Sequence, residues 1–224
     1  MPNQAQALVL LSGGQDSTTC LALALEEFPN GVHALAFDYG QRHRIELEQA
    51  QKIANIAGVP LQILDTRWLA GLSTNALTDP TLPITHLDGK LPSTFVDGRN
   101  LFFLSLAAVI AKQKNIHTLY TGVCETDFSG YPDCRADFIQ SLNQTLNLGL
   151  AYTLKIATPL MWLTKGETVL LMQKLGHLDW YAHTHTCYEG IRPGCRQCPA
   201  CLLRLKGFED AQLKDPLEYR AVTP

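Results

Sequence analysis

The chain has 224 residues, of which 46% are hydrophobic, and a formal net charge of −3. This length fits one α/β domain with at most a small appendage, and the apolar content is ample for a buried core. The slight acidity gives no reason to expect nucleic acid as a direct partner. The longest apolar run, Leu101 to Ala111, falls well short of the ~20 residues that cross a bilayer, so we expect no contact with a membrane.

The chain start and the cysteines bear on the compartment. Residues 1–4 have no basic flank, and no apolar segment with a cleavage site follows them, so we expect no secretion signal. The seven cysteines are odd in number and four of them crowd near the C-terminus, unlike the paired framework of a secreted domain. These features predict a reduced, cytoplasmic protein.

An apolar strand at Leu8 to Leu11 runs into a Ser-Gly-Gly-x-Asp-Ser turn, and a helix follows from Ser17 to Glu27. The two glycines let the backbone approach a ligand, and the first amides of the helix point at an anion. The turn lacks both the Gly-Lys-Ser/Thr ending of P-loop proteins and the spaced glycines of dinucleotide-binding folds. The alternative is a plain strand-turn-helix in which Ser12 or Asp16 caps the helix.

This turn resembles the loops of the pyrophosphate-loop ATPases, which hold the β- and γ-phosphates of ATP while the α-phosphate is attacked. The resemblance implies an adenylated intermediate and release of pyrophosphate. Asp16 fits against a pyrophosphate only if a metal lies between them, and Mg²⁺ is the expected ion. The predicted ATP-binding residues are Leu11, Ser12, Gly13, Gly14, Gln15, Asp16, Ser17, Thr18, Thr19, Cys20 and Leu21.

Strands and helices alternate along the rest of the chain. This alternation predicts a doubly wound α/β fold, with a mostly parallel sheet and helices on both faces. Ligands of such sheets bind beyond the carboxyl ends of the strands, so the loops 12–17, 38–44 and 122–135 should converge on one crevice. The further strands are predicted at Val32–Phe37, Leu61–Leu64, Thr118–Thr121 and Lys155–Thr158, and the further helices at His43–Ala57, Asn100–Gln113, Arg135–Leu146 and Lys165–Leu175.

Two local features of these elements carry separate predictions. Thr164 and Glu167 have the spacing of a capping box, which explains Glu167 without a catalytic role. The connection from Asp65 to Gly98 is too long for an ordinary crossover, so it is either a lid or a segment that binds a partner.

Cys187, Cys195, Cys198 and Cys201 supply four thiols within fifteen residues, among glycines and prolines that make tight turns. Four soft ligands suit a tetrahedral structural Zn²⁺, and an iron–sulfur cluster is the rival. His183 and His185 are second-choice ligands. We expect one zinc site per chain, and we divide the chain into residues 1–180, which bind ATP and substrate, and residues 181–224, a zinc-binding and helical segment packed on them.

Longer motifs around the expected crevice make the resemblance more specific. They are Phe37 to His43, Gly98-Arg99-Asn100, Thr121 to Arg135, Thr158 to Trp162 and the four-cysteine tail. Together they resemble the 7-cyano-7-deazaguanine synthase family of queuosine biosynthesis, over nearly the whole chain. The family usually has proline where this chain has Asp97, and the Asp-Gly pair still predicts a turn.

The resemblance implies a fold like that of the adenine nucleotide alpha hydrolases and a carbon–nitrogen ligase. Its substrates would be 7-carboxy-7-deazaguanine, two ATP and free ammonia, because the chain has no room for a glutaminase domain, and a homodimer is expected. The residues of the motifs that suit the substrate by their chemistry are Tyr39, Arg42, Arg99, Asp127, Phe128, Tyr131, Asp133 and Arg135. Two rival functions are a tRNA sulfur-transferase of the same loop class and a zinc-bearing nucleic-acid-binding module.

Overall fold

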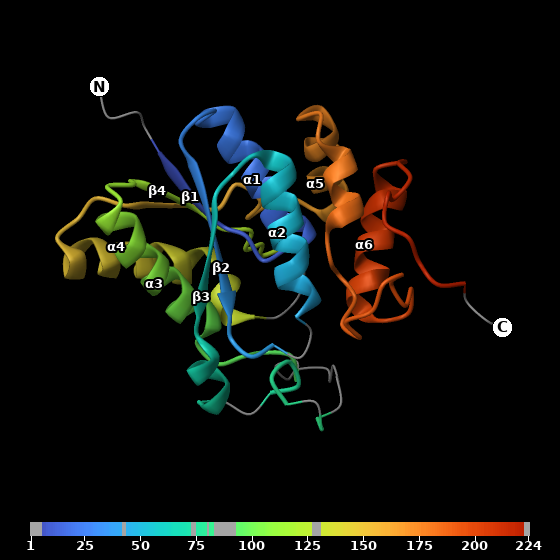
Figure 1. Cartoon of the computed structure of the whole chain (residues 1–224), viewed down its shortest axis with the longest axis horizontal. Helices are drawn as coiled ribbons and strands as arrows, with labels where there is room; N and C mark the ends of the chain where they lie inside the picture. The colour runs from blue at the N-terminus through green and yellow to red at the C-terminus, as the bar shows by residue number, and fades with distance from the viewer. Residues whose placement is uncertain are drawn as a thin grey trace.

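A parallel sheet of five strands forms the centre of the computed structural model, which describes residues 6–41, 44–72, 75–79, 81–82, 93–126 and 131–221. The strand order is β3-β2-β1-β4-β5, and every neighbouring pair is parallel (Figure 1). The predicted fold class is therefore confirmed. The strands are β1 (Ala7–Leu10), β2 (Val32–Asp38), β3 (Leu61–Asp65), β4 (Thr118–Tyr120) and β5 (Lys155–Ala157).

Helices cover both faces of the sheet, as the alternation predicts. Side chains of one β1 face join a core with α1, α2, α5 and α6, and those of the other face join a core with α3 and α4. Within the described ranges, no helix combines the length and apolar character needed to span a membrane. The helices are α1 (Gln15–Glu27), α2 (Ile45–Ala57), α3 (Arg99–Gln113), α4 (Ala136–Leu150), α5 (Lys165–Lys174) and α6 (Pro199–Asp210).

The order of the strands creates the place for a ligand. The chain passes from β1 outward to β2 and β3, and it then returns to the other side of β1 to form β4 and β5. The loops after β1 and β4 therefore leave neighbouring strands in opposite directions and open a crevice between them. The predicted site loops lie at this end of the sheet.

The C-terminal segment packs on the helices of the first face. The α6 helix lies beside α5, and their close approach is visible in Figure 1. The Arg204 guanidinium, only 1% exposed, holds this segment in place through both carboxylate oxygens of Asp215, at 2.8 Å each. It also donates to the Thr184 hydroxyl. The division at residue 180 stays a prediction.

Candidate active site

A cavity of about 370 Å³ lies at the carboxyl ends of β1, β2 and β4. All three loops that were expected to converge contribute to its wall, so the predicted crevice is present. Its polar lining residues are Ser12, Gln15, Asp16, Ser17, Tyr39, Gln41, Glu46, Arg99, Asn100, Thr121, Cys124, Tyr131, Cys134 and Tyr188.

The turn after β1 presents free backbone donors to this cavity. Within the described residues, no side-chain hydrogen bond caps α1 at Gly14, so the amides of the first turn are available there for an anion. Ser12 and Ser17 brace the turn, because the Ser17 hydroxyl accepts from the Ser12 amide at 3.2 Å and lies 3.1 Å from the Ser12 hydroxyl. The capping alternative for Ser12 and Asp16 is therefore not seen.

Two glycines set how closely the loops approach one another. Gly13 has φ +84°, and a Cβ built there would lie 2.3 Å from the carbonyl oxygen of Glu46. A Cβ on Gly122 would lie 2.9 Å from the backbone of Asp16. Both positions exclude any side chain, and the turn is thereby clamped between the start of α2 and the loop after β4.

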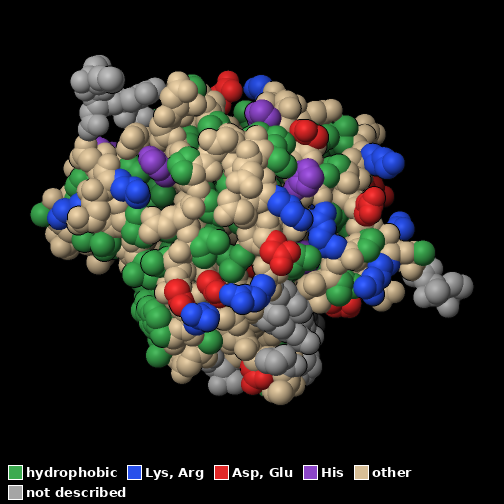
Figure 2. Space-filling model, in the orientation of Figure 1, with side chains coloured by type: hydrophobic (Ala, Val, Ile, Leu, Met, Phe, Trp, Pro, Cys, Tyr) green, Lys and Arg blue, Asp and Glu red, His purple; other side chains and the backbone are tan. Residues whose placement is uncertain are grey.

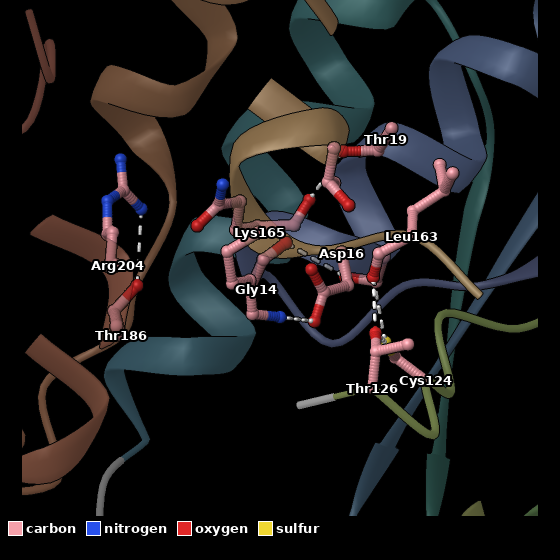
Figure 3. A network of polar contacts seen from close by, with 12 residues as sticks. Gly14, Asp16, Thr19, Cys124, Thr126, Leu163, Lys165, Thr186 and Arg204 are labelled. Carbon is pink, nitrogen blue, oxygen red and sulfur yellow. Dashed lines mark hydrogen bonds and ion pairs between the residues drawn. The ribbon is translucent and has the colours of Figure 1, made fainter. Parts of the chain in front are cut away.

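Asp16 pairs with a lysine that comes from the far half of the chain. The Lys165 ammonium lies 2.6 Å from Asp16 Oδ2 (Figure 3). The other carboxylate oxygen, Oδ1, is buried without a hydrogen-bond partner in the described part of the chain. The capping box of Thr164 and Glu167 is present as predicted and fixes the start of the α5 helix, whose first residue is Lys165. An unpartnered carboxylate oxygen beside this glycine turn suits a divalent cation.

The wall opposite the turn combines aromatic rings with one guanidinium. Arg99 begins α3 after Gly98, which adopts φ +71° as the Asp97-Gly98 turn requires. Its guanidinium lies 5.9 Å from the centre of the Tyr131 ring and hydrogen-bonds Tyr39. Burial and the nearby Glu46 raise the pKa of the Tyr39 hydroxyl to about 12, which keeps it protonated near neutral pH.

Glu46, which the sequence analysis did not single out, adds a carboxylate to the same wall. It lies in the first turn of α2 and lines the cavity. Burial raises its carboxyl pKa to about 7, and the charge of Arg99 opposes this rise. The group therefore exchanges its proton near neutral pH.

Not all predicted substrate residues reach the cavity. Asp133 is buried and accepts a hydrogen bond from the Asn100 amide at 3.1 Å, so it caps α3. Arg135 is exposed in front of α4, and neither residue is part of the cavity wall. Arg42, Asp127 and Phe128 lie outside the described residues. Tyr39, Arg99 and Tyr131 are the predicted substrate residues that line the wall.

The predicted ATP-binding stretch also divides in two. Leu11, Ser12, Gly14, Gln15, Asp16 and Ser17 line the cavity, whereas the Gly13 carbonyl accepts from the His185 amide at 2.8 Å. Residues 18–21 are buried in α1 and lie outside the cavity wall. Contact with ATP stays a prediction for the whole stretch.

The four cysteines predicted as a metal site come together at the C-terminal end. Their sulfur atoms all lie within 4.8 Å of one another. Backbone amides point at the sulfurs: those of Gln197 and Cys198 donate to Cys195 Sγ at 3.4 and 3.2 Å. Hydrogen bonds from the Cys201 thiol and from backbone amides lower the pKa of Cys198 to about 5, against the effect of burial. Converging sulfurs with amide donors suit a thiolate-bound metal.

The histidines considered as second-choice ligands are placed elsewhere. The His185 ring nitrogen Nε2 lies 2.8 Å from the Cys187 carbonyl oxygen, and His183 is exposed. Among the described residues, the metal-ligating cluster consists of the cysteines alone. His185 connects this cluster to the turn after β1, because its amide donates to the Gly13 carbonyl.

The family can now be identified. A model of the family described as "Queuosine biosynthesis protein QueC" matches residues 6–212. The chain belongs to this family. Its role in queuosine biosynthesis and its character as an enzyme follow from that membership, and the resemblance seen in the sequence is confirmed.

Solved structures with a similar arrangement have low sequence identity. An NH3-dependent NAD synthetase from Campylobacter jejuni is 17% identical with a TM-score of 0.48, over 80% of this chain and 67% of that one. The U34-tRNA thiolase NcsA from Methanococcus maripaludis is 16% identical with a TM-score of 0.47, and the match covers 92% of this chain and 65% of that one. A predicted subunit of a tRNA methyltransferase from Methanocaldococcus jannaschii is 19% identical with a TM-score of 0.49, and the match covers 77% of this chain and 74% of that one. Similarity at this level does not bear on the activity of the chain.

Sequence reasoning missed the wall residues Glu46 and Tyr188, and it missed Lys165, which pairs with Asp16. Glu46 and Lys165 are ordinary helix residues by pattern, and only the packing of α2 and α5 brings them to the turn. Tyr188 had one available signal, because it follows the predicted metal ligand Cys187 directly. Its ring reaches the cavity, and burial raises its pKa above the usual range.

Proposed function

We propose that the protein converts 7-carboxy-7-deazaguanine and ammonia to 7-cyano-7-deazaguanine at the expense of two ATP. The observation that carries this proposal is the shared cavity. The turn after β1, with Asp16, opens onto the same space as Arg99 and Tyr131, and Lys165 pairs with Asp16. This arrangement suits one reaction between a triphosphate and an aromatic acid.

In the first stage the substrate carboxylate attacks the α-phosphate of ATP, and pyrophosphate leaves. The free amides of the α1 turn and the Lys165 ammonium would hold the phosphates. Ammonia then attacks the activated carbonyl carbon. The bond from this carbon to the AMP oxygen breaks, AMP leaves, and an amide remains. The protein needs no nucleophile of its own, and positioning supplies most of the catalysis.

In the second stage the amide oxygen attacks another ATP, again at the α-phosphate. Loss of AMP and of the remaining protons on nitrogen then gives the nitrile. An amide oxygen is a poor leaving group, and adenylation turns it into a good one. The need to activate oxygen twice explains two ATP for each product.

The donor sets support two metal ions with different tasks. Mg²⁺, bound through the free Oδ1 of Asp16 directly or through water, would neutralise phosphate charge. Zn²⁺ would occupy the cluster of Cys187, Cys195, Cys198 and Cys201 and would have only protein ligands. With no open position, that ion would stabilise the fold rather than take part in the reaction.

The wall residues suit the heterocycle by their chemistry. The Arg99 guanidinium would pair with the substrate carboxylate, and the Tyr131 ring would stack on the flat base. Arg42, Asp127 and Phe128 remain candidates for the same task. Asp133 and Arg135 would act indirectly, through the start of α3 and of α4.

The experiment combines purified protein, 7-carboxy-7-deazaguanine, ATP, Mg²⁺ and ammonium, and follows the products by mass spectrometry. We expect the nitrile, with two AMP and two pyrophosphate for each molecule formed. AMP release that stops at the amide would restrict the activity to the first stage. No AMP at all would contradict the proposal, and iron with labile sulfide in anaerobically purified protein would favour the sulfur-transferase.

The proposed enzyme acts as a homodimer in the cytoplasm, without direct contact to nucleic acid. An exposed apolar surface over β3, the turn that follows it and the start of α3 supports pairing with a second copy (Figure 2). Its members include Ile63, Trp68, Leu72 and Leu101, exposed by 45%, 54%, 61% and 41%. Sedimentation of the wild type and of Trp68→Lys tests this: a dimer that dissociates in the variant is expected, and a wild-type monomer would refute it.

A further inference from the structure

Formation of a nitrile from ammonia requires nitrogen to lose all its protons. Ammonium, the form that prevails in neutral water, must first lose a proton to become a nucleophile. The nitrogen sheds another when the amide forms, and the amide sheds the last two when the nitrile forms. An active site for this chemistry needs a proton acceptor beside the reacting carbon.

Two carboxylates, Asp16 and Glu46, line the cavity in the described part of the chain. Asp16 is engaged by Lys165 at 2.6 Å and faces the phosphate-binding turn. Tyr39 and Cys134 of the wall are weak acceptors, because burial raises the pKa of each to about 12. Of the two cavity carboxylates, Glu46 has no hydrogen bond within the described residues, and its electrostatic partner is Arg99.

The position of Glu46 fits the task. Its backbone carbonyl packs directly against Gly13, where a Cβ would approach to 2.3 Å, so the residue adjoins the turn proposed to hold the phosphates. Its side chain faces Tyr39 and Arg99. Glu46 therefore lines the cavity next to the turn proposed to hold the phosphates, and its carboxylate interacts with the wall proposed for the substrate.

We propose that Glu46 is a catalytic residue that accepts protons from the attacking and departing nitrogen. This inference rests on the proposed function. In the first stage the nitrogen lone pair forms the bond to carbon, the bond from carbon to the AMP oxygen breaks, and a nitrogen proton moves to the Glu46 carboxylate. In the second stage the same carboxylate takes the protons lost as the carbon–nitrogen triple bond forms. Water removes each proton before the next transfer, and no oxidant or reductant is needed.

The charged and titratable groups around Glu46 set its pH dependence. Arg99 favours the ionised form, and burial opposes it, which leaves the pKa at about 7. Tyr39 stays neutral, and Asp16 and Lys165 neutralise one another across the turn. A base with this pKa works above pH 7 and loses activity as the pH falls below it.

The test measures two partial reactions in Glu46→Gln. The first is exchange of pyrophosphate into ATP with 7-carboxy-7-deazaguanine, which reports adenylation. The second is amide and nitrile formation with ammonium at pH 7. We expect exchange to stay within about threefold of the wild type and product formation to fall by about 10²-fold, the scale of a lost general base. Glu46→Asp should recover part of the rate.

Two conditions separate proton transfer from a merely structural role. Hydroxylamine is largely unprotonated at pH 7. The rate at which Glu46→Gln forms the hydroxamate should therefore fall much less, relative to the wild type, than its rate of amide formation. Raising the pH to 9 should also shrink the deficit, because free ammonia becomes abundant. Glu48→Gln is the control, since Glu48 lies on the same helix and is exposed.

Each outcome decides the inference. Selective loss of amide formation, relieved by hydroxylamine, supports it. An equal loss of pyrophosphate exchange and of product formation in Glu46→Gln overturns the inference. A rate of product formation within about threefold of the wild type also overturns it. Both outcomes leave the proposed function standing. A wild-type enzyme that forms neither amide nor nitrile would overturn both.

Discussion

The two sides of the cavity are built in different ways. The side formed by the turn after β1 is local, since Ser12, Gly14 and Ser17 are close in sequence and brace one another by hydrogen bonds. The opposite wall is assembled from distant segments, with Glu46 from α2, Arg99 from α3 and Tyr188 from the cysteine segment. A local site depends on backbone geometry, whereas an assembled one depends on the packing of the whole molecule. The two sides should therefore fail in different ways.

The largest expected effect comes from a substitution in the local side of the cavity. Gly13→Ala places a methyl group 2.3 Å from the Glu46 carbonyl and puts alanine at φ +84°. We expect a loss of about 4 kcal/mol or more in the free energy of unfolding, or failure to fold. Chemical denaturation measures it.

Gly149→Ala is the matched control for Gly13→Ala. Gly149 lies inside α4, and a Cβ there meets no atom within 4 Å. Alanine should stabilise the helix by roughly 0.5–1 kcal/mol. Equal effects of the two substitutions would contradict the tight clamping of the turn.

The next effect concerns the proposed metal site, whose cysteine segment contributes Tyr188 to the assembled wall. Cys201→Ser removes a fully buried thiol of the four-sulfur cluster. We expect loss of bound zinc and destabilisation of roughly 3–5 kcal/mol, because a structural metal contributes folding energy directly. Elemental analysis and thermal melting measure both. Cys20→Ala, which removes a core thiol outside the cluster, should keep its metal; full zinc content in Cys201→Ser would refute the assignment.

A smaller effect is expected where the two sides meet. Asp16→Asn keeps the shape of the side chain but removes the charge that faces Lys165 and the proposed Mg²⁺. The rate of AMP release should fall by about 10²-fold, which corresponds to about 2.7 kcal/mol. Glu167→Gln is the control, because glutamine also completes a capping box and the activity should be retained. Unchanged AMP release in Asp16→Asn would remove Asp16 from the phosphate site.

The smallest expected effect is on stability and concerns Glu46. Its folded-state pKa of about 7 lies above the ordinary value of 4.5, so ionisation destabilises the folded protein. That penalty is absent below about pH 4 and grows as the pH rises through 7. Glu46→Gln should therefore be more stable than the wild type at pH 8, by about 2 kcal/mol and at most roughly 3, with little difference at pH 4. Urea denaturation at the two pH values measures it, and a constant difference would contradict the raised pKa.

The sequence alone determined the parallel α/β class, the Ser-Gly-Gly-x-Asp-Ser turn and the set of four thiols. Each depends on residues that are near neighbours in the chain, such as Gly13 with Gly14 or Thr164 with Glu167, so the local pattern already contains the geometry. The resemblance over residues 37–43, 98–100 and 121–135 added the family.

Only the tertiary structure decided which side chains form the wall. Asp133 has the chemistry of a base-binding residue, but the fold uses its carboxylate to cap α3. Glu46 and Lys165 have the patterns of ordinary helical residues, but α2 and α5 bring them to the turn. Tyr188 reaches the cavity because the cysteine loop folds back toward it. These roles arise from contacts between segments far apart in the chain, and local sequence patterns do not record such contacts.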